Sequence, residues 1–450
     1  MPSLIQARMA SSAEMPAVFS DEALIAHALA FEAGLAEAEA ECGVIPRSAA
    51  RTIAEAAHTL KLDPRELAEA AAHAGTLAIP LVKRLGETVA KIDRDAAGHV
   101  HFGATSQDLA DTALVLQLRA ACGLLKRDLA RLAEALAALT EKHRGTVMLA
   151  RTLMQPALPT SFSVKTASWL IGVEDGLLRL MRESEHALTL QLGGAAGTLS
   201  ALGDQGVEVA KRLASRLGLA LAPMPWHTRR DAIAGLGSAL GILTGTIGKI
   251  ARDLALLSQA EIGEAAEPSG QGRGGSSTMP HKQNPIGSMV ALAAATRAPG
   301  LVATLLSAMV QEHERALGGW QAEAPTLAAL FEAAHGATFA MAETIGGLKV
   351  DTGAMRRNLE RLNGLVLAER LMLALAPKLG RNEAHHAVEN LSRRAVAENR
   401  QLRDLALAEE SITAELSPAL ITQIFDPSTY IGASEAFIDN ALAIHRRRVR

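Results

Sequence analysis

The sequence predicts an all-α fold: an elongated subunit with a central long-helix bundle and smaller helical N- and C-terminal domains. Hydrophobic residues make up 49% of the chain and aromatic residues only 3%, so the apolar content is chiefly alanine and leucine. These residues favour helices, whereas the β-branched and aromatic residues that favour strands are scarce. Several helical runs also exceed about 25 residues, which is typical of a rod-like bundle. An all-β fold is therefore excluded.

The length and the composition indicate three parts. At roughly 150 residues per domain, 450 residues correspond to about three domains. After Asp351 the composition shifts towards Arg, Glu and His, and shorter helices are expected there. We therefore expect an N-terminal helical domain over 1–110, a central long-helix bundle over 111–350 that carries a loop of unusual sequence, and a C-terminal helical domain over 351–450.

Helix start and stop signals are clear in the N-terminal part. Ser20 is typical of a helix N-cap and Gly43 of a helix end. The run Asp63–Glu66 places a proline at the first helical position, and it predicts a second helix that ends near Gly75. Between Ser20 and Gly43, apolar residues recur on one helical stripe: Leu24, Ala28, Phe31 and Leu35.

The sequence of the central part predicts a series of long helices. Thr105 and Asp108 form a capping-box start for a helix that runs to about His143, with leucines on several faces. Strands should be confined to short pieces such as Thr146–Thr152. Further helical runs are expected at about 160–191, 204–218, 230–264, 285–315 and 322–347.

Charge and cysteine content exclude several classes of protein. Lys and Arg number 45 against 48 Asp and Glu, so no global basic field exists to hold nucleic acid. Two cysteines exclude a disulfide scaffold and fit the reducing cytoplasm, and the N-terminus lacks the features of a signal peptide. The uncharged stretch 232–248 reaches only about 25 Å as a helix, short of a bilayer core of roughly 30 Å. We therefore expect a cytoplasmic protein with no nucleic-acid or membrane partner.

The most informative segment is Pro268–Asn284, PSGQGRGGSSTMPHKQN. Its glycines fit GxGxxG, but a helix precedes them and no βαβ unit surrounds them, so we reject a dinucleotide site. From Pro268 to Gln311 the chain has no Asp or Glu, and its cations include Arg273, Lys282 and Arg297. A glycine-rich loop with hydroxyls and cations and without acids predicts an anion-binding site.

Three motifs in order resemble the fumarase/aspartase superfamily. Gly275–Pro285, GSSTMPHKQNP, resembles its signature loop, His101–Thr112 its first conserved region and Arg151–Pro159 its second. The resemblance implies an enzyme that adds or eliminates a group beside a carboxylate through a stabilised carbanion. It also implies a helical homotetramer in which three chains build each active site, and it implies no metal and no organic cofactor.

The resemblance also implies roles for individual residues. Ser276 would be the catalytic serine, and Lys282 and Asn284 would bind a substrate carboxylate. The substrate-binding residues implied around them are Thr105, Ser106, Thr152, Gln155, Ser277, Arg230, Arg315, His101 and His281. The His99–His101 pair lacks a third ligand nearby, so we do not expect a metal site there.

One position departs from the pattern of many relatives. Superfamily lyases that expel an amine or hydroxide typically carry a histidine where this chain has Leu153, and leucine cannot donate a proton. General acid catalysis typically contributes 10²–10⁴-fold. A carboxylate leaving group, with a carboxylic-acid pKa near 4, needs no such help. Lactone chemistry therefore fits this site.

A closer resemblance is carried by five further stretches: Gln191–Leu199, Pro225–Asp231, Gln311–Gly318, Gly364–Glu369 and Leu379–His386. They resemble the bacterial 3-carboxy-cis,cis-muconate cycloisomerase family. That resemblance implies a tricarboxylate substrate and lactonisation to 4-carboxymuconolactone in protocatechuate degradation by the β-ketoadipate pathway. Two alternatives stay open: adenylosuccinate lyase or another fumarate-releasing lyase, and a non-catalytic helical scaffold, which would have no use for Ser276, Lys282 and Asn284.

Overall fold

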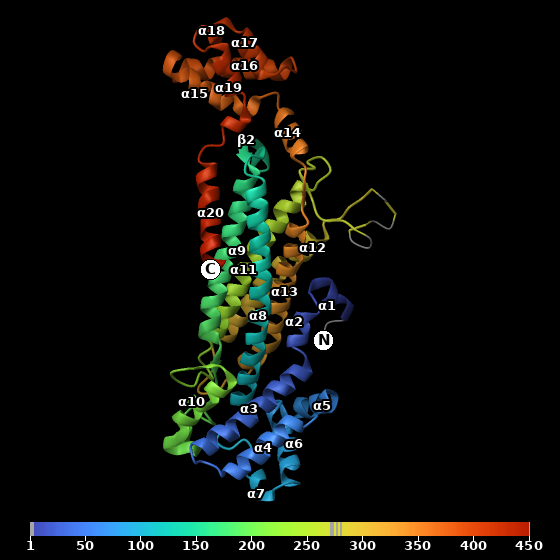
Figure 1. Cartoon of the computed structure of the whole chain (residues 1–450), viewed down its shortest axis with the longest axis vertical. Coiled ribbons are helices and arrows are strands. Elements are labelled where there is room, and N and C mark those ends of the chain that lie inside the picture. The colour runs from blue at the N-terminus through green and yellow to red at the C-terminus, as the bar shows by residue number, and fades with distance from the viewer. Residues whose placement is uncertain (1–3, 271–273, 276–277, 280, 450) are drawn as a thin grey trace. The chain divides into compact units, whose positions relative to one another are not determined.

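The structure, a computed structural model, describes residues 4–270, 274–275, 278–279 and 281–449 (Figure 1). The predicted all-α class is confirmed, because 71% of the chain is helical. The strands among the described residues are short, and the longest has 7 residues.

The chain divides into two compact units, each built from three segments. The five longest helices each contribute residues to both units. The division at 110 and 350 stays a prediction. Unit 1 comprises Met1–Leu129, Asp175–Gly248 and Val290–Ala340, and unit 2 comprises Ala130–Glu174, Lys249–Met289 and Met341–Arg450.

Unit 1 contains the N-terminal helices, and their predicted ends are confirmed. Ser20 Oγ accepts a hydrogen bond from the amide of Ala23 at 3.2 Å, and the Asp63 carboxylate accepts one from the amide of Arg65 at 2.8 Å. Gly75 ends its helix in the left-handed region at φ 71°. The helices are α1 (Leu4–Ala10), α2 (Glu14–Val18), α3 (Asp21–Glu41), α4 (Arg47–Thr59), α5 (Pro64–Ala74), α6 (Ala78–Ala90), α7 (Arg94–Ala97) and α10 (Gly206–Leu217), with a 3₁₀ turn at Ser200–Gln205 before α10.

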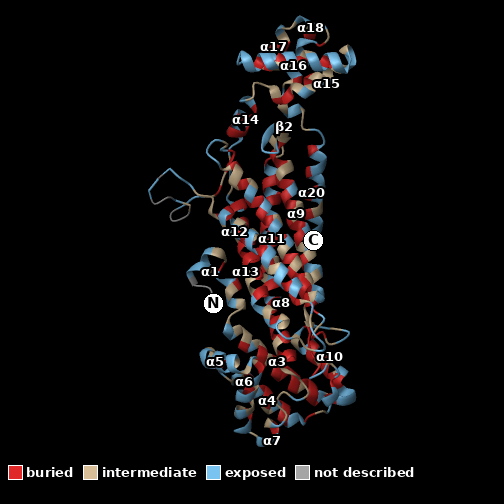
Figure 2. Cartoon of the chain, turned by 180° about the vertical axis from the view of Figure 1, so that it is seen from behind, coloured by how far each residue is buried: buried red, intermediate tan, exposed pale blue. Residues whose placement is uncertain are grey.

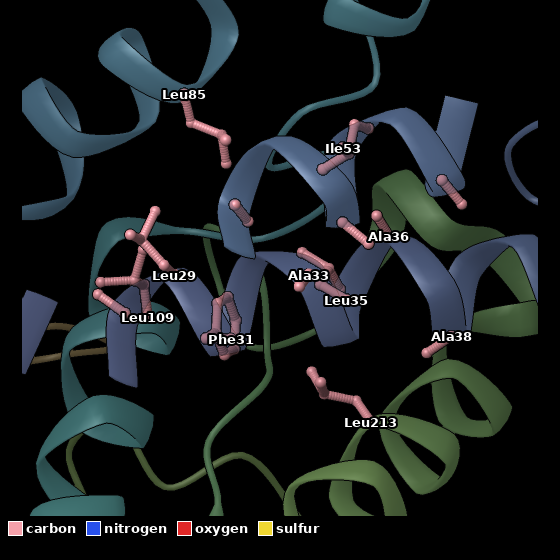
Figure 3. Packing of buried hydrophobic residues seen from close by; sticks show 14 of the residues in the cluster. Leu29, Phe31, Ala33, Leu35, Ala36, Ala38, Ile53, Leu85, Leu109 and Leu213 are labelled. Carbon is pink, nitrogen blue, oxygen red and sulfur yellow. The ribbon is translucent and has the colours of Figure 1, made fainter. Parts of the chain in front are cut away.

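The core of this region forms around α3. This helix packs against α4 and α10 and is largely buried, whereas α5 is mostly exposed (Figure 2). Because α3 buries apolar residues on several sides, it lies inside the helical layer rather than on its surface. Figure 3 shows the packing around it, with Phe31 and Leu35 of α3, Ile53 of α4, Leu85 of α6, Leu109 of α8 and Leu213 of α10.

The predicted long helices are present. Residues 258–263 form a turn after α11, closed by Gly263 at φ 61°, so this helix ends seven residues before the predicted position 264. The predicted helix 285–315 likewise ends at Ala308. The helices are α8 (Ser106–Lys142), α9 (Phe162–Ala187), α11 (Asp231–Leu257), α12 (Ile286–Ala308) and α13 (Gly319–Gly346).

Two of these helices are long and apolar enough to cross a membrane by length and composition alone. In α11, 61% of the most apolar stretch is buried inside the protein, as in a core helix, whereas in α12 only 22% is buried. The uncharged stretch 232–248 lies within α11, which continues past Lys249 to Leu257.

Unit 2 contains a β-hairpin and the C-terminal helices. The predicted strand is present as β1 (Val147–Thr152), and it pairs antiparallel with β2 (Gln155–Ser161), which was not predicted. Two-residue pairings complete the strands: β3 (Thr189–Leu190) with β4 (Ala220–Leu221) in unit 1, and β5 (Ala265–Ala266) with β6 (Lys349–Val350) here. The shorter helices expected after Asp351 are α14 (Thr352–Glu360), α15 (Ala368–Leu379), α16 (Arg381–Ala397), α17 (Leu402–Ala408), α18 (Glu410–Thr413), α19 (Pro418–Ile424) and α20 (Ser434–Val449), with 3₁₀ turns at Leu365–Leu367 and Pro427–Thr429.

Candidate active site

The predicted site residues lie in two groups, one in each unit. In unit 1 the first conserved motif is held by Asp108, a fully buried residue in the first turn of α8. Its carboxylate accepts hydrogen bonds from the amides of Thr105, Gly193 and Gly194 at 2.9–3.0 Å, and His227 Nε2 lies 2.7 Å away. One carboxylate therefore joins three segments that are far apart in the sequence.

The structure brings Thr105 and Arg315 together beside this carboxylate. The Arg315 guanidinium donates a hydrogen bond to Thr105 Oγ1, and both side chains are half-buried, so the pair keeps contact with solvent. Ser106 follows as the first residue of α8, and His101 lies in the preceding turn, with Nδ1 2.6 Å from the Glu32 carboxylate. A hydroxyl, a guanidinium and an imidazole at one loop fit the binding of an anion.

Arg230 lies between two carboxylates in the core of unit 1. It is 2% exposed, and its guanidinium donates to Asp111 of α8 at 2.8 Å and to Glu323 of α13 at 3.0 Å. Burial raises the pKa of Glu323, and the hydrogen bond and charge of Arg230 oppose that rise. Two carboxylates therefore compensate the charge of Arg230 within the protein. A direct contact between Arg230 and a substrate stays a prediction.

In unit 2 the described part of the signature loop is closed at its base. The Asn284 amide donates to the Gly274 carbonyl at 2.7 Å, and Gly275 pairs with Gln283 in an antiparallel bridge. Gly274 has φ 75°, and a Cβ there would lie 2.9 Å from the Asn284 carbonyl oxygen, so this turn requires glycine. The predicted catalytic Ser276 and its neighbour Ser277 lie outside the described residues.

A cavity of about 460 Å³ lies beside this loop base, and His281, Lys282 and Asn284 line it. His281 and Lys282 are exposed and Asn284 is half-buried. Glu267 is the acidic residue among those that line the cavity, and its carboxylate accepts from the amides of Gly287 and Ser288, both at 2.7 Å. Glu267 thus caps the start of α12, which leaves the Lys282 ammonium available to an anion.

Thr152 and Gln155 pair at the end of the β1–β2 hairpin. The two residues that join them, Leu153 and Met154, have φ of 49° and 66°, and Leu153 is 97% exposed. Left-handed backbone costs a residue with a Cβ roughly 1–2 kcal/mol. Such strain concentrates at functional positions. Next to the tip, where Arg151 pairs with Pro156, the hairpin is tied by the Arg151 guanidinium, which donates to the Glu264 carboxylate at 2.8 and 2.9 Å.

Sequence reasoning missed three residues that organise these groups. Asp108 was interpreted only as a helix cap, while His227 and Glu267 had no predicted role. His227 does fall within the family-like stretch 225–231, which is the signal that could have singled it out. Its contact with Asp108 spans 119 sequence positions, and no local pattern encodes such a contact.

The described residues contain one group of three side chains that could hold a metal ion, and it lies outside these motifs. It consists of His385, His386 and Glu389 on α16, and the Glu389 carboxylate already accepts a hydrogen bond from Arg393 at 2.7 Å. Neither His99 nor His101 belongs to such a group in the part of the chain that the structure describes.

Comparison with known proteins shows which protein family the chain belongs to. The family described as Lyase matches residues 8–300, and the family described as Adenylosuccinate lyase C-terminus matches residues 364–441. The chain therefore belongs to the lyase family of the fumarase/aspartase superfamily.

Individual relatives within this superfamily show which of its members the chain resembles. The chain is 50% identical over 436 residues to 3-carboxy-cis,cis-muconate cycloisomerase of Bradyrhizobium diazoefficiens, covering 97% of each protein. It is 50% identical over 434 residues to the protein of the same name from Pseudomonas aeruginosa, covering 96% of this chain and 95% of that one. The crystal structure of 3-carboxy-cis,cis-muconate lactonizing enzyme from Pseudomonas putida matches with a TM-score of 0.94 and 43% identity, covering 99% of each chain.

The position of Asp108 predicts a variant that loses both stability and substrate binding. In Asp108→Asn, the charge shared by Thr105, Gly193, Gly194 and His227 is lost. Removing one partner from a buried ionic cluster costs about 3–5 kcal/mol. We expect a lower unfolding temperature by calorimetry and a raised KM for an anionic substrate, because Thr105 loses its anchor.

Asp128→Asn is the matched control for this variant. Asp128 is also fully buried on α8 and pairs with an imidazole, His335 Nε2, at 2.9 Å. It should lower the unfolding temperature and leave KM unchanged. Equal changes of KM in the two variants would contradict the role given to Asp108.

Proposed function

We propose that the chain catalyses the intramolecular cycloisomerisation of 3-carboxy-cis,cis-muconate to 4-carboxymuconolactone in protocatechuate degradation. The observation that carries the proposal is Leu153, which occupies the tip of the hairpin between Thr152 and Gln155 and offers no acidic proton. The two relatives that are 50% identical over nearly the whole chain are named for this activity. The chain is then an intramolecular lyase, classed among the isomerases.

The reaction forms one C–O bond and moves one proton, so no atom is gained or lost. A substrate carboxylate oxygen adds to a carbon of the conjugated double bond, and the electron pair of that bond shifts to the neighbouring carbon. That carbon is stabilised as an aci-carboxylate by the carboxylate attached to it. A proton then reaches the carbon and gives the lactone. In reverse, the leaving group is a carboxylate, which departs without a general acid.

In this proposal the residues of the two groups have separate roles in substrate binding and proton transfer. Lys282 and Asn284 hold the aci-carboxylate, where negative charge develops and where fixed donors stabilise the transition state most. Ser276 delivers the proton, and its anion is stabilised by the same cationic loop. Thr105 and Arg315 bind a second carboxylate of the substrate. No metal or organic cofactor is needed for these steps.

The alternative function is that of adenylosuccinate lyase, and one observation favours it. The family described as Adenylosuccinate lyase C-terminus matches residues 364–441. Elimination of an amine needs a proton donor at the leaving nitrogen, however, and Leu153 cannot be that donor. The C-terminal match covers 78 residues, whereas the cycloisomerase relatives match 436 and 434.

A direct assay separates these functions. Purified protein is mixed with 3-carboxy-cis,cis-muconate and the diene absorbance is followed, with adenylosuccinate in a parallel reaction. Loss of diene absorbance supports the cycloisomerase, and release of fumarate from adenylosuccinate supports the lyase. Inactivity towards both substrates would leave the helical scaffold as the remaining interpretation and would overturn the proposal.

Ser276→Ala should abolish turnover while the protein remains folded. Without the serine hydroxyl no group delivers the proton to the aci-carboxylate carbon, and we expect kcat to fall by at least about 10²-fold. Circular dichroism should match the unsubstituted protein. Ser48→Ala, at an exposed serine of α4, is the control and should keep full activity. Near-normal turnover of Ser276→Ala would refute the assigned role.

We further propose that the enzyme is a cytoplasmic homotetramer with shared active sites. In such an assembly three chains build each site, so the residues of unit 1 and those of unit 2 come together from different subunits. An exposed apolar helix supports the assembly: Met289 and Leu306 of α12 are 52% and 48% exposed. The free cysteines Cys42 and Cys122 fit a reducing compartment, and burial raises the pKa of the Cys122 thiol to about 12.

Leu306→Glu should dissociate the tetramer. A charged side chain in an apolar interface is left unpaired, which costs several kcal/mol per subunit. We expect a smaller particle by light scattering after size exclusion, together with loss of activity, because the sites are shared. Val396→Glu, which changes an apolar residue of α16 that is 66% exposed, is the control and should stay tetrameric. An unchanged tetramer in Leu306→Glu would contradict the proposed interface.

A further inference from the structure

Glu32 lies in the middle of the apolar core around α3. Its side chain is fully buried, and its neighbours Phe31 and Ala33 belong to the core drawn in Figure 3. Burying a carboxylate among apolar side chains is costly unless a partner compensates the charge. Glu32 Oε1 lies 2.6 Å from Nδ1 of His101, and Oε2 has no hydrogen-bond partner among the described residues. His101 is therefore the compensating group.

A second buried carboxyl on the same helix shows what happens without such a partner. Glu39 lies two turns further along α3, is completely buried, and neither of its oxygens has a hydrogen-bond partner among the described residues. Burial, together with the nearby charge of Glu32, raises the pKa of Glu39 to about 9. Glu39 is therefore neutral at pH 7, and it provides an internal reference for Glu32.

His101 is held in an unusual backbone position beside the first conserved motif. Its φ is 59°, a left-handed value that is uncommon for residues other than glycine, and four residues later comes Thr105. Nδ1 faces Glu32, the ring keeps 16% of its surface exposed, and Nε2 has no partner in the part of the chain that the structure describes. Because Glu32 fixes Nδ1, the nitrogen left for a ligand is Nε2.

Electrostatics favours the charged form of this imidazole. Burial alone would lower the pKa of His101, but the charge and hydrogen bond of Glu32, followed by the charge of Asp108, raise it above its ordinary value. The charged groups that face the ring are these two carboxylates, Glu32 from α3 and Asp108 from α8. The carboxylate of Asp108 is shared with His227 and three backbone amides, so Glu32 is the dedicated partner.

We propose that Glu32 is a positioning residue that holds His101 as an imidazolium, with its Nε2–H presented to a carboxylate of the substrate. The inference rests on the proposed function, because it takes the polycarboxylate as the ligand of His101. Glu32 itself contacts no substrate and acts only through the ring. The arrangement adds a cation to Arg315 at the same loop, so it favours substrates with several carboxylates over those with few.

The coupling between the two residues can be measured without any substrate. Deuterium exchange at the histidine C2–H, followed by mass spectrometry of peptides, gives the titration midpoint of each histidine. An opposite charge within about 4–6 Å shifts a pKa by roughly 1–3 units. We therefore expect Glu32→Gln to lower the midpoint of His101 by about one pH unit or more. Glu39→Gln, an equally buried change on the same helix, should leave it in place.

The pH dependence of KM then tests whether the imidazolium binds substrate. A raised pKa means that the charged form is present at lower pH and is lost as pH rises through that pKa, so KM should rise there. In Glu32→Gln the rise should begin about one pH unit lower, so KM at pH 7.5 should be up to about tenfold higher with kcat little changed. Glu39→Gln should follow the unsubstituted enzyme, and His101→Gln should remove the pH-dependent rise.

The outcomes separate this inference from the proposed function. If the unsubstituted protein does not turn over 3-carboxy-cis,cis-muconate, the proposed function fails, while the exchange experiment still reports on the pair. If the enzyme is active but Glu32→Gln leaves the exchange midpoint or the KM profile unchanged, the inference is overturned. If Glu32→Gln does not fold, two other variants test the inference. Glu32→Asp retains the negative charge, so the exchange midpoint of His101 should stay raised. In His101→Gln, a pH dependence of KM that matches the unsubstituted enzyme overturns the inference as well.

Discussion

The buried carboxylate of Asp108 is the interaction on which the first part of the site depends. It lies at the start of α8, where it receives the amide of Thr105, the amides of the turn at Gly193 and Gly194, and the ring of His227. A charge removed from water costs several kcal/mol unless donors surround it. The Asp108 carboxylate therefore anchors the Thr105 backbone, and Thr105 Oγ1 accepts a hydrogen bond from Arg315.

Other buried charges of unit 1 are compensated in the same way, each between segments distant in sequence. Asp111 and Glu323 enclose Arg230, Asp128 pairs with His335, and Glu32 pairs with His101. Helices rich in alanine and leucine, such as α3, are apolar on several faces and can pack in many rotations with similar energy. A buried ion pair has only one geometry that satisfies both partners. These pairs therefore add a geometric requirement to the apolar contacts between the segments that they join.

Local signals in the sequence predicted the parts of the fold that local interactions decide. The caps at Ser20 and Asp63 and the glycine at Gly75 act within one helical turn, so their patterns are visible in the chain. Strand β2 was missed because its two prolines are unusual within a strand, and its pairing with β1 is a tertiary choice. Arg230 was predicted to bind substrate, and nothing nearby in sequence reveals its partners Asp111 and Glu323, which lie 119 and 93 positions away.

The tip of the β1–β2 hairpin carries Leu153, the residue on which the proposed chemistry depends. Leu153 is held at positive φ, as the two-residue turn of this hairpin requires, and it is almost fully exposed in the subunit. In a lactonising enzyme the nucleophile is a substrate carboxylate, which must remain ionised and unpaired to attack. An imidazolium at this position would form an ion pair with that carboxylate and stabilise the ground state more than the transition state. In the proposed reaction a leucine supplies neither a proton nor a charge, so the residue that removes proton donation would also leave the nucleophile reactive.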